Sequence, residues 1–145
     1  MTQYEHMIGE VAEASGAQIA IEQDRVAEIA LDGTIVLVKP LDDTESAVAL
    51  FAVVSDEGVD ETQMKKALEL NLFARGTAGG TIGLFADSLI YSARQPLEGL
   101  SAQEFAERLC EFAHAARRIG DALTRPGGER DEAFAMAIGD VAHIV

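Results

Sequence analysis

The glycine-rich segment 76–80, Gly-Thr-Ala-Gly-Gly, is the first place where residue type and spacing could support chemistry. Such a loop binds phosphate when a Lys-Ser or Lys-Thr pair leads it into the N-terminus of a helix, whose free amides contact the phosphate oxygens. Here Thr81 follows in place of a lysine, and residues 81–85 are typical of a strand. We therefore interpret the segment as a flexible connection between a helix and a strand, with phosphate binding as the alternative.

The pair Cys110 and His114 could form a second kind of site, because the two residues would lie one turn apart on a helix. A cysteine beside a histidine can act as an activated nucleophile when a third group orients the imidazole. No orienting acid accompanies this pair, which borders an apolar stripe of the predicted helix. We therefore predict that Cys110 packs as a small hydrophobic residue.

Metal-binding patterns are also weak. His6, His114 and His143 are far apart and have no second ligand at the spacing of a metal site. The acidic segment 42–45 lacks the glycine and the spaced oxygens of an EF-hand loop. We expect no metal, no cofactor and no enzymatic activity.

The charge of the chain narrows the classes of partner. Its 145 residues include 11 Lys and Arg against 25 Asp and Glu, which gives a net charge of −14. Nucleic acids and anionic membranes need a basic surface, so neither is expected as a partner. The longest uncharged stretch, residues 76–86, is too short and too rich in glycine to cross a bilayer. With one cysteine and no basic residue before Arg25, the chain is expected to be soluble and cytoplasmic.

Three helices are predicted from periodicity and capping signals. Apolar residues at helical spacing predict a first helix close to the N-terminus. Asp60 followed by Gln63 marks the start of a second helix. Ser101 and Glu104 form a capping box for a third helix, which Pro126 ends.

Five strands are predicted around these helices. The dipeptide Asp32-Gly33 separates the runs 27–31 and 34–38, which is a strong signal for a hairpin. The remaining strands are predicted at residues 47–54, 81–85 and 89–94. The element order α-β-β-β-α-β-β-α predicts an α+β fold with an antiparallel five-stranded sheet and three helices.

The second and third strands are apolar on both faces. Ile35 and Leu37 alternate with Val36 and Val38, and residues 47–54 contain no charge. An antiparallel sheet in a small monomer normally keeps one face polar. Because three helices cover roughly one face of five strands, we expect part of the other face to meet a second subunit or a partner. The alternative is that helices on both sides bury the whole sheet.

Several motifs occur in an order that resembles a known family. They are Leu70-Asn71-Leu72-Phe73, the segment 76–80, Thr81-Ile82-Gly83-Leu84, the run Arg94-Gln95-Pro96-Leu97 and the capped helix from Ser101. In this order, most clearly from Leu68 to Arg118, the chain resembles the class I type III secretion chaperones, the Tir-chaperone-like family. The resemblance favours one domain over residues 1–125. Residues 126–145 depart from the family pattern and are interpreted as a tail that forms a short helix or is mobile.

The resemblance implies a homodimeric chaperone in the bacterial cytoplasm. It would bind the N-terminal segment of a type III secreted effector in extended form and keep it soluble and ready for export. Dimer contacts in the family map here onto Met64, Leu68, Leu72 and Ile82. Effector contacts from the first helix and the early strands would map onto Ile8, Val26, Val36, Val38 and Val48.

Two other functions fit parts of the same pattern. A regulatory module of the same fold, which sequesters a secretion or transcription regulator, would need the same apolar groove. A small-ligand-binding domain would instead use the segment 76–80.

Overall fold

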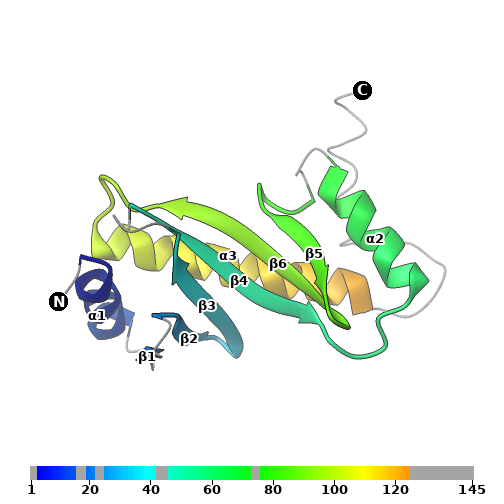
Figure 1. The fold of residues 1–145 in the computed structure, drawn as a ribbon, viewed down its shortest axis with the longest axis horizontal. Coiled ribbons are helices and arrows are strands. Elements are labelled where there is room, and N and C mark those ends of the chain that lie inside the picture. The colour runs from blue at the N-terminus through cyan, green and yellow to red at the C-terminus, as the bar shows by residue number, and fades with distance from the viewer. Residues whose placement is uncertain (1–2, 16–18, 22–24, 42–45, 73–75, 125–145) are drawn as a thin grey trace. The chain divides into compact units, whose positions relative to one another are not determined.

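The computed structural model describes residues 3–15, 19–21, 25–41, 46–72 and 76–124. These residues form three helices and six strands (Figure 1). The helices are α1 (Gln3–Ser15), α2 (Glu61–Asn71) and α3 (Ala102–Thr124). The strands are β1 (Ile19–Ile21), β2 (Ala27–Leu31), β3 (Thr34–Pro40), β4 (Ala47–Ser55), β5 (Thr81–Phe85) and β6 (Ser88–Pro96).

The strands form one sheet in the order β1-β2-β3-β4-β6-β5. The predicted α+β class and the order of the predicted elements are confirmed. The structure adds a sixth strand, β1, to the five that were predicted, and pairs its Ile19 with Ile29 of β2. Three residues are too few for an alternating pattern to mark a strand, so only the pairing with β2 identifies it.

The described residues divide into two compact units, each made of two segments of the chain. The described residues of the first unit lie within Met1–Ala52 and Arg94–His114, and those of the second lie within Val53–Ala93 and Ala115–Val145. The predicted tail at residues 126–145 lies outside the described residues.

In the first unit, the predicted hairpin joins β2 to β3. Asp32 and Gly33 have φ angles of 49° and 81°, the left-handed region that a two-residue hairpin turn requires. The resulting register pairs Ile29 with Val36. Both side chains are buried, so one register places the apolar residues of the two strands on the same, inner face.

Tyr4 of α1 connects this helix to the strands of the first unit. Its hydroxyl oxygen lies 2.9 Å from the carbonyl oxygen of Val38 and 3.0 Å from that of Arg25. A buried phenol needs such an acceptor, because an unpaired hydroxyl in the core costs free energy. Ile8 and Val11 are buried on the same helix. The periodicity seen in the sequence therefore corresponds to the inner face of α1.

Both predicted caps are present. The backbone N–H of Gln63 donates to the Asp60 carboxylate at 3.0 Å, at the start of α2. Before α3, the N–H of Glu104 donates to the Ser101 hydroxyl at 3.1 Å, and the N–H of Ser101 donates back to Glu104 at 3.3 Å. These bonds satisfy amides that the first turn of a helix leaves without partners.

The predicted apolar stripe of α3 is buried along its length. It consists of Phe105, Leu109, Phe112, Ala116, Ile119 and Leu123. Cys110, however, is exposed, so the prediction that it packs as a small hydrophobic residue is wrong. The neighbouring Ala113 is buried instead. Position 110 lies at the edge of the stripe, where a small rotation of the helix decides between core and solvent.

Candidate protein-binding surfaces

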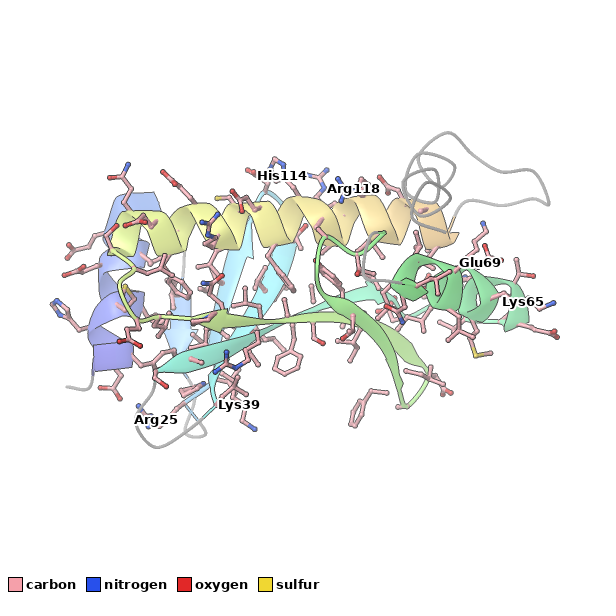
Figure 2. The ribbon with its side chains drawn as sticks, turned by 90° about the horizontal axis from the view of Figure 1, so that it is seen from above. Arg25, Lys39, Lys65, Glu69, His114 and Arg118 are labelled. Atoms are coloured by element: carbon pink, nitrogen blue, oxygen red, sulfur yellow. The ribbon has the colours of Figure 1, made fainter. Side chains whose placement is uncertain are left out.

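The side of β3 that faces away from α3 carries exposed apolar residues. Ile35 is 54% exposed, whereas Val36 and Val38 are fully buried. Figure 2 shows Lys39 of β3 on the side of the strand that faces away from α3. Because residues two apart on a strand share a face, Ile35 and Leu37 lie on that side too.

Phe51 of β4 extends this face within the first unit. It pairs with Leu37 in the antiparallel register, and both side chains are partly exposed. Glu28 of β2 pairs with Leu37 from the other side, so a charged residue borders the apolar group. We call Ile35, Leu37 and Phe51 the outer sheet face. An apolar group with a charged border is typical of a protein-binding surface.

The predicted effector-binding residues lie mostly elsewhere. Ile8, Val36, Val38 and Val48 are each at most 1% exposed, inside the core of the first unit. Val26 is partly exposed. A partner could reach the four buried side chains only if this core opened, so their role in binding stays a prediction. Since both faces of β3 are apolar, the sequence did not indicate which face the helices cover.

In the second unit, α2 carries two separate apolar stripes. Ala67 and Leu70 are buried. The other stripe consists of Met64 and Leu68, and Leu72, the residue that follows α2, extends it. All three are predicted dimer residues and are exposed, Leu68 by 71%. An amphipathic helix normally exposes its polar side, and an exposed stripe of three large apolar residues is typical of a binding surface.

Strand β5 adds two exposed apolar residues in the same unit. Leu84 is exposed and Phe85 is 74% exposed, next to the hairpin turn that leads to β6. The fourth predicted dimer residue, Ile82, is only 7% exposed. Leu84 and Phe85 were not among the predicted contact residues. Neighbouring strand residues point to opposite faces, so one of the two had to face outward.

We call the exposed apolar residues of these two elements, Met64, Leu68, Leu72, Leu84 and Phe85, the α2–β5 surface, with Leu84 and Phe85 on opposite faces of β5. Helix α2 packs beside β5 (Figure 1). Two hydrogen bonds join the Asn71 side chain to the backbone of Ile82, each 2.8 Å long. The Lys66 ammonium also donates to the carbonyl of Ala122, at 3.4 Å. These contacts hold the exposed stripe of α2 in position within its unit.

The glycine-rich segment is a packed turn that leads into a strand. Thr77 is fully buried, and its hydroxyl donates to the carbonyl of Gly80 at 2.6 Å. The N–H of Gly80 donates back to the Thr77 carbonyl at 3.0 Å. Residues 81–85 form β5, so the segment lacks the helix N-terminus that a phosphate loop requires. The predicted connection between a helix and a strand therefore includes a hydrogen-bonded turn.

The Cys110 and His114 side chains are both exposed. His114 Nε2 lies 3.9 Å from a carboxylate oxygen of Asp32, but both of these side chains are more than two-thirds exposed to solvent. An ion pair exposed to this extent is screened by water and contributes little stability. His6 lies beside Glu10 on α1, at 2.6 Å.

The described residues contain no group of three His, Cys, Asp or Glu side chains that could hold a metal ion. The acidic segment 42–45 and His143 lie outside them. None of the described helices is long and apolar enough to span a membrane.

The chain is similar to two solved chaperone complexes. One is described as the HopA1-SchA chaperone-effector complex, with 14% identity and a TM-score of 0.61 over 82% of this chain and 94% of that one. The other is the Yersinia pestis type III secretion chaperone SycH in complex with a stable fragment of YscM2, with 18% identity and a TM-score of 0.59. It covers 79% of this chain and 97% of that one. At these identities, the similarity shows a shared fold.

No curated protein sequence matches the chain significantly. The model of the Tir chaperone protein (CesT) family, however, matches residues 6–119. This match includes most of α1 and α3, all of α2, all six strands and both surfaces described above. The resemblance inferred from the ordered motifs is thereby confirmed, and the chain belongs to the Tir chaperone protein (CesT) family.

Proposed function

We propose that this chain is a homodimeric chaperone in the bacterial cytoplasm, without enzymatic activity. It binds the N-terminal segment of a type III secreted effector in extended form and keeps it soluble and export-competent. The observation that carries the proposal is the exposure of large apolar side chains on regular elements, of which Leu68 and Phe85 are the most exposed. Family membership adds the expectation that these side chains meet other proteins.

The α2–β5 surface is the proposed contact between two copies of the chain. Leu68 lies in the middle of its exposed stripe, with Met64 and Leu72 one turn away on either side. In a two-fold dimer the same surface on both copies comes together, so one apolar surface on each chain is sufficient. Burial of these side chains would supply the hydrophobic stabilisation that the free monomer lacks.

The outer sheet face is the proposed contact for the client. An extended segment can place alternate side chains against Ile35, Leu37 and Phe51, because its own side chains also repeat every two residues. Addition of a strand to a sheet edge would contribute main-chain hydrogen bonds that do not depend on client sequence. The net charge of −14 favours clients with basic segments.

The test is co-expression with the protein encoded beside this chain, followed by size exclusion with light scattering. We expect a stable complex that contains two copies of the chain and a client whose N-terminal segment is protected from proteolysis. Ile35→Asp should abolish the complex and leave the dimer intact. The control Gln103→Asp adds the same charge at an exposed position of α3 in the first unit and should bind normally.

Three outcomes would contradict the proposal. A monomer that forms no client complex would exclude the chaperone function as stated. A complex with a regulator that is not exported would favour the regulatory alternative. A rise in melting temperature with a nucleotide or metabolite, in the absence of any protein partner, would favour the ligand-binding alternative.

A further inference from the structure

Strand β5 lies at one end of the sheet, so among the described residues no strand lies beside one of its edges. The pair Phe85 and Ser88 flanks the two-residue turn to β6. In an antiparallel pair, residues alternate between bonding to the partner strand and facing away from it. From the turn, this alternation directs the backbone N–H and C=O groups of Leu84 and Ile82 toward the open edge. Such groups are a template for an added strand.

The side chain of Asn71 bonds to this edge of β5 at Ile82. Its Nδ2 donates to the Ile82 carbonyl oxygen, and its Oδ1 accepts from the Ile82 N–H, both at 2.8 Å. One side-chain amide therefore provides the donor and the acceptor that the backbone of a neighbouring strand would provide. Asn71 is the last residue of α2, and both bonds are partly buried. Hydrogen bonds shielded from water are costly to replace.

The start of the strand is closed in a second way. Gly80 immediately precedes β5, and its N–H donates to the carbonyl of Thr77 at 3.0 Å. The next outward-facing pair after Ile82 belongs to Leu84, beside the exposed end of the strand. If another strand approached this edge of β5, the N–H of Gly80 and the backbone groups of Ile82 would already be bonded. Only the backbone groups of Leu84 would be left to bond to it. A single pair of bonds cannot hold an added strand, because strand addition depends on a continuous ladder.

We infer that Asn71 closes the β5 edge, so that a second copy of this chain contacts the α2–β5 surface through side chains and not through strand addition at β5. This inference rests on the proposed homodimer and adds a residue that determines how the copies associate. A closed edge has a physical advantage for this chain. Exposed apolar residues beside an open edge would recruit extended chains, and a chaperone for extended clients meets such chains constantly.

The first test uses the unmodified chain, in which Asn71 is the only asparagine. Its side-chain amide is therefore the only one whose protons correlate with an asparagine Cβ, which distinguishes it from the glutamine side-chain amides in a nuclear magnetic resonance spectrum. We expect the bonded Nδ2 proton to exchange with solvent at least tenfold more slowly than the side-chain amide protons of Gln103, which is exposed on α3. Exchange as fast as that of Gln103 would overturn the inference.

The second test compares Asn71→Ala with the control Glu69→Ala, which alters an exposed residue of the same helix. In Asn71→Ala, the Ile82 amide should exchange at least tenfold faster, and light scattering should show species larger than a dimer as concentration rises. Glu69→Ala should behave as the unmodified chain. If Asn71→Ala unfolds, Asn71→Gln, which keeps the amide but displaces it by one methylene, is expected to show the same two changes.

The inference fails if the Ile82 amide exchanges at the same rate in the folded variant, or if the variant still forms dimers and nothing larger. Client binding is not part of either readout. If the chain binds no client, the proposed function is contradicted. The Ile82 exchange rate still tests whether Asn71 closes the β5 edge.

Discussion

The hydroxyl of Tyr91 donates a hydrogen bond of 2.6 Å to the carbonyl oxygen of Thr77. This bond joins β6 to the turn that precedes β5, in the second unit. Tyr91 itself is buried and pairs with Ile82 in the register of the two strands. The glycine-rich turn is therefore held in place by a residue that lies 14 positions away in the sequence.

Tyr91→Phe should lower the free energy of unfolding by about 1 kcal/mol, the usual net contribution of one such hydrogen bond. The phenylalanine ring still occupies the buried position of the tyrosine ring. The Thr77 carbonyl keeps one hydrogen bond, because it also accepts from the N–H of Gly80. Urea denaturation would measure the change. A loss of less than a few tenths of a kcal/mol would mean that the bond contributes little to the folded state.

The stability of the chain should fall in alkaline solution because of the same phenol. Burial raises the pKa of Tyr91 above its usual value of 10.0, although the nearby Arg118 guanidinium partly lowers this pKa. From about pH 10 upward, the unfolded chain releases a proton that the folded chain retains, so the free energy of unfolding decreases as pH rises toward the folded pKa. Below that range this group contributes no pH dependence.

Urea denaturation of the unmodified chain and of Tyr91→Phe across this alkaline range provides the measurement. The difference in stability between the two should shrink as pH rises, because only the unmodified chain carries the titrating phenol. A constant difference would contradict the assignment.

Gly80→Ala should lower the free energy of unfolding by about 1–3 kcal/mol, the usual cost of an overpacked core position. A Cβ atom at Gly80 would lie 2.6 Å from the carbonyl oxygen of Ser92 and 2.6 Å from the ring of Tyr91. Gly83→Ala is a matched control, because a Cβ there has no atom within 4 Å. The control should change stability by less than about 0.5 kcal/mol. Equal effects of the two substitutions in thermal unfolding would argue against close packing at Gly80.

Leu68→Asp should weaken the proposed dimer at least about tenfold, since an unpaired carboxylate buried in an apolar contact is costly. Leu68 is 71% exposed in the single chain, so the substitution should leave the monomer folded. Analytical ultracentrifugation would measure dissociation, with circular dichroism as a check on folding. Thr62→Asp places the same charge at another exposed position of α2 and should keep the dimer. A fully stable Leu68→Asp dimer would show that the contact lies elsewhere.

Local signals in the sequence were sufficient for the main elements. The Asp32-Gly33 turn and the caps at Asp60 and Ser101 involve only neighbouring residues, so their geometry follows from residue type. The order of the motifs also indicated the family, which the match over residues 6–119 confirms. The surplus of apolar residues on β3 predicted an exposed apolar face, and Ile35 lies on it.

The tertiary structure decided the remaining features, because they depend on residues distant in sequence. Alternation on β3 is apolar on both faces, so only packing against the helices could assign Val36 to the core and Ile35 to solvent. The short strand β1 exists through its pairing with β2. No periodicity connects Asn71 with Ile82, since a side-chain amide can bond to a backbone only where folding brings a helix end beside a strand edge. By itself the sequence determined which segments are regular and apolar; the packing of those segments determined which surfaces are left for other proteins.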